Sequence, residues 1–532
     1  MKKLKFALAA LMAFSIIATA SAQYQSNSVR LLSQIPLTGF PGSPGNGSGC
    51  VGYTSPSGKE YAIIGLKNGN AVVNITNPFV PVIVGHIPGV QSTWHEVCVL
   101  GAYAYACTEG GQGVQIIDLT QVDNGVVSLA GTMTLGGLSR GHTVQAMPSS
   151  NLLFVHGGDI NGLRAYDCTN PTAPVSVGSW TGKYVHDAQF VKYTSGPYAG
   201  KEICFACCAN GSNGGLYIID VTTTVNGQGQ HVPAMQTLGF LHYFPTGVDN
   251  FYCHSGSLTP DKRFFLINDE FDESNSLVPN CSTHIVNVEN LAAPTYVNKF
   301  VNPINVIDHN SMVQDNFLML AAYRGGLRIY DIANTPTITE VGFFDTFPTG
   351  NGFAYEGAWG TWTGYASGNV IISDINRGLF VVDPSEAMGF GAPIVSVAHS
   401  GTFGEGDGVI GLRKDDSQEF TVFTRSGKGD MIATLQTTAV TKTKLDVSMR
   451  ARSAAGPLDI VVLQVKNQTT GLFESIGTWG MTTVEALYEV TNLDGTKYIA
   501  TDGTIVIKMQ LRTTNQSGVK VFADMLRAKA HG

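Results

Sequence analysis

Five histidines occupy the same position in successive copies of a repeated sequence unit. They are His95 in Thr-Trp-His-Glu-Val, His142 in Arg-Gly-His-Thr-Val, His186 in Val-His-Asp-Ala, His254 in Tyr-Cys-His-Ser-Gly and His309 in Asp-His-Asn-Ser-Met. A further unit carries Glu356 at this position. Imidazole and carboxylate groups are typical ligands of divalent transition metals. We therefore expect a subset of about three of these six side chains to bind one such ion.

A second set of polar residues lies where the second strand of each unit is expected to end. These candidate rim residues could be further metal ligands or could accept hydrogen bonds from the ring N–H groups of the histidines. They are Glu109, His156, Asp159, Asp269, Glu270, Asp272, Tyr323, Arg324 and Asp374. Glu96 and Asp187 directly follow two of the histidines. Strand alternation predicts that these two acids face the other way.

The acidic stretch 268–273 is an alternative site, for Ca²⁺, because carboxylate oxygens are ligands of that ion. It lacks the spaced ligands of an EF-hand loop, and a solvated acidic turn is the favoured interpretation. The histidines also have an alternative role. Duplicated units inherit the same residue, which can hydrogen-bond the backbone or a carboxylate of the neighbouring unit. The sequence leaves both roles of the histidines open.

The elements that position these residues belong to a repeat. A strand that ends in an acid or an amide occurs seven times, and its last residues are Asn74, Asp118, Asp167, Asp220, Asn287, Asp331 and Asp383. Their spacing of 44 to 67 residues is typical of a four-stranded β-propeller blade. In a propeller the innermost strands start at one face of a central channel, so the histidines would converge there. A β-sandwich array or a β-helix is the rival interpretation, but this period is too long for a β-helix coil.

We expect an all-β chain, with a seven-bladed β-propeller over residues 23–394, followed by a linker and a small C-terminal β-sandwich over residues 395–532. The last unit lacks an outer strand after Asp383, whereas an unassigned strand, Val29–Leu37, stands near the start of the chain. We expect this strand to complete the last blade, which would close the ring and remove two free sheet edges.

The repeat stops near Val395, and a different alternating pattern follows it. Apolar residues such as Ile505, Ile507 and Met509 alternate with polar ones, which indicates half-buried strands. Gly401–Gly411 are expected to form a flexible connection or the start of the second domain.

The first 22 residues are typical of a secretory signal peptide. Three lysines precede an apolar run from Phe6 to Ala18, and Ala20-Ser21-Ala22 forms an A-x-A cleavage site. This run is shorter than the ~20 residues of a membrane span, and no later segment is long and apolar enough to span a bilayer. We therefore expect a secreted or outer cell-surface protein without a transmembrane span in the mature chain.

Composition and charge exclude several classes of protein. Hydrophobic residues make up 43% and charged residues 14% of the chain, and there are 62 glycines, a composition that favours short strands and turns over disorder. The formal net charge is −8, and it becomes −11 without the three signal lysines, so nucleic acid is not an expected partner. The sequence contains no G-x-S-x-G elbow, P-loop, H-E-x-x-H or dinucleotide fingerprint.

Nine cysteines leave at least one without an intramolecular partner, in an exported chain where disulfides can persist. Cys98 and Cys107 fall on two consecutive expected strands and are the favoured bridge. Cys204 and Cys207 have C-x-x-C spacing, but they lie in a strand-like run, which favours core packing or a structural disulfide over redox chemistry.

Several motifs in order resemble the choice-of-anchor B family of secreted bacterial proteins, whose propeller units are related to LVIVD repeats. They are Trp94-His-Glu, Glu109 with Gly113 to Leu119, Tyr184 to Gln189, His254 to Glu273, Gly326 to Asp331, and Gly357-Ala-Trp with Ser367 to Asp374 and Gly378-Leu-Phe. The resemblance covers roughly residues 30–390 and implies a secreted or surface-displayed propeller. It brings no established activity. The end of the chain, Lys520 to Gly532, departs from the anchored pattern because it has neither an apolar tail nor an evident sorting motif.

Two functions follow from these features. The first is a secreted or cell-surface propeller that binds a ligand, a polysaccharide or a protein partner, with a metal site at the channel face. The alternative is a metal-dependent enzyme, an oxidase or a hydrolase, that uses the same face. Propeller oxidases of the selenium-binding type, which also place histidines at the channel mouth, show only that such chemistry suits the architecture.

Overall fold

The computed structural model describes residues 24–392 except 210, and residues 394–400, 420–423, 428–439, 442–454, 460–513 and 520–531. The expected signal segment, 1–22, and the expected connection, 401–411, lie outside these residues. The chain divides into two compact units, the larger formed mainly by residues 31–382 and the smaller mainly by 383–532. In the described part of the chain, no helix has the length and apolarity needed to cross a bilayer.

Seven antiparallel sheets of four or more strands occupy the described part of the larger unit. The first three contain β3 (Gly47–Thr54), β4 (Glu60–Leu66), β5 (Gly69–Asn74) and β6 (Val82–Pro88); β7 (His95–Leu100), β8 (Tyr103–Thr108), β9 (Val114–Asp118) and β10 (Ser128–Met133); and β11 (Thr143–Met147), β12 (Leu152–Gly157), β13 (Ile160–Asp167) and β14 (Val175–Trp180).

The next three contain β15 (Asp187–Lys192), β16 (Glu202–Cys208), β17 (Gly215–Asp220) and β20 (Gln236–Leu241); β21 (Cys253–Leu258), β22 (Phe264–Asp269), β23 (Ser282–Asn287) and β24 (Thr295–Val301); and β25 (Asn310–Gln314), β26 (Phe317–Ala321), β27 (Leu327–Asp331) and β28 (Thr339–Phe344). The last contains β29 (Ala358–Trp362), β30 (Val370–Asp374), β31 (Gly378–Asp383) and β2 (Arg30–Ile35). Two short strands, β18 (Thr223–Val225) and β19 (His231–Pro233), form a separate hairpin, and β1 (Ser26–Asn27) precedes β2.

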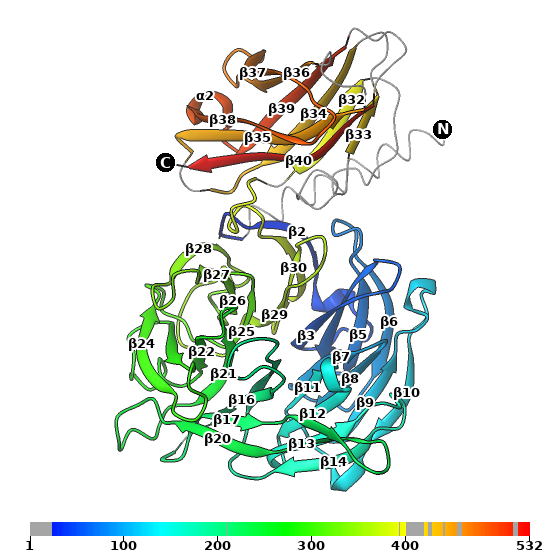
Figure 1. The fold of residues 1–532 in the computed structure, drawn as a ribbon, viewed down its shortest axis with the longest axis vertical. Coiled ribbons are helices and arrows are strands. Elements are labelled where there is room, and N and C mark those ends of the chain that lie inside the picture. The colour runs from blue at the N-terminus through cyan, green and yellow to red at the C-terminus, as the bar shows by residue number, and fades with distance from the viewer. Residues whose placement is uncertain are drawn as a thin grey trace. The chain divides into compact units, whose positions relative to one another are not determined.

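The first strands of successive sheets contact one another in order, and β29 contacts β3, so the sheets form a closed ring (Figure 1). Each later strand of a sheet lies farther from the centre of that ring. Antiparallel four-stranded sheets arranged in this way around a central channel define a β-propeller. The structure therefore confirms the all-β propeller class that the repeat predicts.

The acid or amide that ends each third strand has a local structural role. In all seven sheets its side-chain Oδ1 accepts a hydrogen bond from the backbone N–H two residues later, over 2.7–3.0 Å. This Asx turn satisfies a backbone donor where the strand ends and redirects the chain toward the fourth strand. The repeated acids and amides are therefore turn residues.

The strand β2 is the outer strand of the last sheet, where it lies beside β31. Leu32 of β2 is fully buried in the same hydrophobic cluster as Leu379 and Val381 of β31 and Ile64 of β4. Gln34 donates a hydrogen bond to the Arg377 carbonyl over 3.0 Å. A strand from the start of the chain thus packs into the last sheet of the repeat and into the interface with the first.

The expected Cys98–Cys107 disulfide is wrong. In the β7–β8 pair, Cys98 lies opposite Tyr105 and Cys107 lies opposite Glu96, so the two cysteines are not cross-strand partners. Both are buried free thiols, as are the cysteines of the C-x-x-C stretch on β16. Burial raises the pKa of the Cys204 and Cys207 thiols well above the ordinary value, which fits core packing and opposes redox reactivity.

The smaller unit contains two antiparallel sheets. One has the strand order β32 (Ile394–Ser400), β34 (Lys428–Gln436), β39 (Thr504–Arg512), β36 (Ile460–Lys466) and β37 (Phe473–Gly480), and the other has β33 (Phe420–Phe423), β40 (Lys520–His531), β35 (Lys444–Ser453) and β38 (Ala486–Asp494). A short helix, α2 (Gly495–Tyr498), follows β38. Side chains from both sheets form one buried cluster, with Ile505, Ile507 and Met509 of β39 among them. Two sheets around one core form a β-sandwich.

We predict that Leu32→Ala destabilises the propeller by about 2–5 kcal/mol, because it leaves a cavity where β2 packs on the last sheet. Leu129→Ala, on an outer strand where the side chain is 46% exposed, is the matched control and should change the free energy of unfolding by less than about 0.5 kcal/mol. Urea denaturation of both variants tests this. Equal effects of the two substitutions would mean that β2 contributes no packing to the ring.

Candidate metal centre

Four of the five histidines that share one position in the repeat, here called the register histidines, lie side by side at the starts of the innermost strands. The ring centroids are 4.2 Å apart for His142 and His186, 4.0 Å for His186 and His254, and 4.4 Å for His254 and His309. All four side chains are buried. The propeller thus gathers these imidazoles from four successive sheets into an arc, because each innermost strand begins at the same face.

Backbone carbonyl groups of neighbouring sheets hold two of these rings, His186 and His309, in place. His186 Nδ1 donates to the carbonyl oxygen of His254 over 3.2 Å, and His309 Nδ1 donates to that of Trp359 over 2.5 Å. A carbonyl oxygen only accepts, so Nδ1 carries the proton and a neutral ring presents the Nε2 lone pair. The structural and the ligand roles of the histidines are therefore compatible with each other.

Glu270 lies next to two of the histidines in the arc. Its carboxylate oxygens are 3.9 Å from His254 Nε2 and 3.8 Å from His309 Nε2. One donor atom from each of these three residues lies within 4.8 Å of the other two. Ligands at ~2.0–2.2 Å from a tetrahedral ion are roughly 3.4 Å apart, so a small side-chain adjustment would let all three bind one ion. Tyr323 donates a hydrogen bond to Glu270 over 2.5 Å and orients it.

Burial keeps the two imidazoles in the form that binds metal. It lowers the pKa of His309 to about 3 and, with the neighbouring imidazoles, lowers the pKa of His254 well below its ordinary value. Both rings are therefore neutral near pH 7, as metal ligation requires. His142 differs because Glu109 Oε1 is 2.6 Å from its Nδ1. Burial opposes the charged form of His142, but the hydrogen bond and charge of Glu109 outweigh it and raise the pKa of His142.

Other candidate residues do not join this group. His95 Nε2 lies 3.1 Å from the Val90 carbonyl oxygen, to which it donates, and Glu356 forms an ion pair with Arg324. Asp159 is exposed beside Arg140.

Three further candidates have structural partners. His156 Nδ1 donates to the His186 carbonyl. Asp374 accepts backbone hydrogen bonds from Asn376 and Arg377 in the turn after β30. Asp269 accepts hydrogen bonds from the Tyr243 hydroxyl and the Tyr252 backbone N–H.

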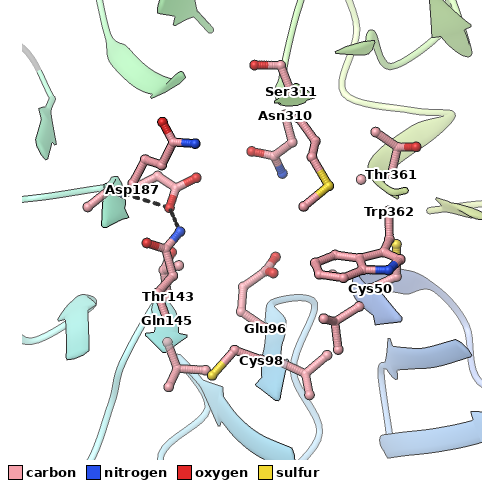
Figure 2. Close-up of a pocket in the computed structure, with 18 of the residues that line it drawn as sticks. Cys50, Glu96, Cys98, Thr143, Gln145, Asp187, Asn310, Ser311, Thr361 and Trp362 are labelled. Carbon is pink, nitrogen blue, oxygen red and sulfur yellow. Dashed lines mark hydrogen bonds between the residues drawn. The ribbon is translucent and has the colours of Figure 1, made fainter. Parts of the chain in front are cut away.

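A cavity of about 380 Å³ lies along the innermost strands, and the four histidines of the arc are among its lining residues. Glu96 and Asp187 also line it, and Figure 2 shows Glu96 pointing into its interior. Strand alternation predicts that these acids face the other way from the histidines, yet both residues border the same cavity. An innermost strand has no sheet neighbour on its channel side, so successive side chains on both of its faces can border the channel.

The two cavity acids each have one hydrogen-bonding partner that the sequence interpretation missed. Trp359 Nε1 donates to Glu96 over 2.6 Å. Gln145 Nε2 donates to Asp187 over 2.6 Å (Figure 2). Burial raises the pKa of Glu96 to about 7 and the pKa of Asp187 to about 6. The sequence contains a signal for Gln145, because Gln145 and Gln189 each follow a register histidine by three positions. In the structure both glutamines line the cavity.

Exposed aromatic side chains lie on the loops that lead into two of the innermost strands. Trp94, directly before β7, is 42% exposed, and Tyr355, shortly before β29, is 48% exposed. Tyr355 contacts the ring of Tyr323, whose hydroxyl binds Glu270. The exposed ring of Tyr355 therefore lies near the carboxylate of the candidate centre.

The favoured interpretation of stretch 268–273 as a solvated acidic turn is wrong. Asn268, Asp272 and Glu273 are completely buried, together with Asp308 from the loop before β25. In the folded turn these acids lie with Asp308 of the next sheet in one buried cluster.

No family model matches this sequence, and no curated protein matches it. Among solved structures, the chain is similar to a periplasmic gluconolactonase of Pseudomonas aeruginosa, with a TM-score of 0.39 and 12% identity over 53% of this chain and 80% of that chain. It is also similar to a chain in the crystal structure of the mitotic checkpoint complex, with a TM-score of 0.38 and 12% identity over 60% of this chain and 83% of that chain. Both likenesses are at the level of the fold, and neither assigns an activity. The chain is a β-propeller protein with a histidine-lined channel.

We predict that Glu96→Gln stabilises the protein at pH 8 but has little effect at pH 4.5. The folded protein holds the Glu96 proton up to about pH 7, whereas the unfolded chain releases it near 4.5, so wild-type stability falls as pH rises between these values. The variant avoids this loss and keeps an acceptor for Trp359. Because the carboxyl group faces the cavity, we expect a gain of about 1–2 kcal/mol in urea denaturation at pH 8.

Glu289→Gln, at an exposed site on the same propeller, is the matched control and should show no such pH dependence. A gain for Glu96→Gln that is equal at both pH values would contradict the assigned titration.

Proposed function

We propose that the chain is an exported β-propeller protein that binds a divalent transition metal ion through His254, His309 and Glu270, and that it binds an extracellular ligand over the same face. The observation that carries this proposal is the convergence of two neutral imidazole nitrogens and one carboxylate within 4.8 Å of one another. Nitrogen and oxygen donors in this ratio suit zinc and its neighbours in the first transition series better than calcium.

Three protein ligands leave at least one coordination position for water or a ligand, as in sites that bind substrates. Glu270 is 13% exposed, so the centre has contact with solvent at the mouth of the channel. Tyr355, whose ring contacts Tyr323, supplies an exposed ring near this mouth, and Trp94 is an exposed ring directly before another innermost strand. Rings of this kind stack on the apolar faces of sugars, and carboxylates accept hydrogen bonds from sugar hydroxyls, which favours a polysaccharide over a protein partner.

Export and family membership are part of the proposal. Export is supported by the basic, apolar and A-x-A pattern of the first 22 residues, and membership of the choice-of-anchor B family by the ordered motifs between Trp94 and Phe380. The acidic net charge of the chain opposes nucleic acid as a partner.

We predict that the purified protein, incubated with Zn²⁺ or Co²⁺ and then desalted, retains one ion per chain. His254→Gln with His309→Gln should lower retention at least tenfold, because one carboxylate alone cannot hold the ion. Metal analysis by mass spectrometry measures this, and circular dichroism checks that the variant is folded.

The matched control is His86→Gln with His242→Gln, two partly buried histidines that lie outside the channel lining. Full metal retention in the His254/His309 variant, or none in the wild type, would refute the centre.

A second candidate function is a metal-dependent hydrolase. The observation that favours it is Glu96, a carboxyl group with its pKa raised to about 7 in the cavity that His254 and His309 also line. A carboxylate with this pKa can act as a general base near neutral pH, and a metal-bound water is a suitable nucleophile for it to assist.

One assay separates the two functions. We expect at least one of a panel of polysaccharides to retard the metal-loaded protein in affinity electrophoresis. The double variant Trp94→Ala, Tyr355→Ala should bind that polysaccharide with at least tenfold lower affinity. If the protein is a hydrolase, new reducing ends appear with the metal-loaded wild type and disappear with Glu96→Gln. Retardation without product identifies a binding protein, and neither result with any polysaccharide would reject this ligand class.

A further inference from the structure

A second cluster of polar side chains lies beside the candidate metal centre and contains only oxygen donors at its core. Asp272 and Glu273 come from the loop between β22 and β23, Asn268 comes from β22, and Asp308 comes from the loop before β25. All four residues are 0% exposed. One oxygen from each of the three acids lies within 4.8 Å of the others.

Each side chain in this cluster uses one polar atom for structure and leaves another without a partner. Asn268 Nδ2 donates to Asp308 Oδ2 over 2.7 Å, and the Ser282 backbone N–H donates to Glu273 Oε1 over 2.9 Å. His284 Nε2 lies 2.8 Å from Asp272 Oδ2. In contrast, Asn268 Oδ1, Asp272 Oδ1, Glu273 Oε2 and Asp308 Oδ1 are buried and have no hydrogen-bond partner within the described residues.

This arrangement is costly unless something else is bound. A buried carboxylate needs a counter-charge or several hydrogen-bond donors, and an orphaned buried oxygen costs about 1–3 kcal/mol. Among the described residues, His284 is the only basic side chain within 4.0 Å of an oxygen of the three acids, and it contacts Asp272 alone. Four unsatisfied oxygens on four converging side chains therefore lack a partner of positive charge.

We infer that Asn268, Asp272, Glu273 and Asp308 form a buried calcium site, distinct from the histidine centre. The unpartnered amide oxygen of Asn268 is independent of the acids, and it lies on a side chain that is hydrogen-bonded into the cluster through its other atom. Three carboxylates and a neutral oxygen are a ligand set that Ca²⁺ takes in flexible geometry. Mg²⁺ fits less well, because it usually retains several waters and this cluster is fully enclosed.

The site has a clear structural consequence. It joins the β22–β23 loop of one sheet to the start of the innermost strand of the next. Glu270 precedes Asp272 by two residues, and His309 directly follows Asp308. Bound calcium would therefore fix the positions of two of the three ligands proposed for the transition metal.

The test uses the full-length protein with Ca²⁺ alone as the probe. Protein purified without chelator should contain one calcium per chain by mass spectrometry. After extensive dialysis against EGTA, addition of 1 mM Ca²⁺ should raise the melting temperature by roughly 5 °C, with 1:1 saturation in a calorimetric titration. Asp308→Asn should abolish this shift. Asp249→Asn, the same change at an exposed loop residue, should preserve it.

Absence of calcium from the purified protein together with no calcium-dependent shift would overturn the site and show that the carboxyl groups share protons instead. An equal or larger shift with Mg²⁺ would overturn the choice of calcium. These measurements on the wild type decide the question even if Asp308→Asn does not fold. The His254→Gln and His309→Gln variant should keep its calcium shift, so failure of the histidine centre and failure of the calcium site are distinguishable.

Discussion

The free edge of the innermost strands is the constraint on which the site depends. Each sheet satisfies its backbone groups through strand pairing, but the first strand has no partner on its channel side, so buried carbonyl groups there need other donors. Side chains from the neighbouring sheets provide them. Ser48 donates to the His95 carbonyl, Thr143 to the His186 carbonyl and Ser255 to the His309 carbonyl. The imidazole Nδ1 groups of His186 and His309 donate to further backbone carbonyl groups in the same way.

This requirement also determines what the imidazoles can do. A ring whose Nδ1–H is held by a carbonyl keeps one tautomer, and burial keeps that ring neutral, so its Nε2 becomes a fixed electron-pair donor. His186 and His309 are held in this way. Within the arc, only His254 and His309 have a carboxylate within 4 Å that is shared between them. The histidines are repeated along the arc, but a cation is best stabilised where Glu270 lies beside two of them.

The parts of this structure that depend on local interactions could be predicted from the sequence. The acids that end the third strands are visible because each makes an Asx turn with a residue two positions away, and the histidine register is visible because it is tied to the start of a strand. The orientation of Glu96 and the burial of Asp272 and Glu273 could not be predicted. The orientation of Glu96 depends on which faces of an edge strand border the channel. The burial of the acidic loop depends on contacts between two sheets, such as the hydrogen bond of Asn268 to Asp308.

The start of β25 shows how one short segment can serve two kinds of cation chemistry. Asp308 and His309 are consecutive residues, and in an extended chain their side chains point to opposite sides. The structure has Asp308 in the oxygen cluster and His309 in the imidazole arc. The loop after β22 divides its acids in the same way, with Glu270 at the arc and Asp272 and Glu273 in the cluster. A hard cation and a transition metal would thus be sorted by donor type although their ligands alternate along the same two segments. Loss of the first ion would release the backbone that holds the ligands of the second, so the order of binding should be calcium first and transition metal afterwards.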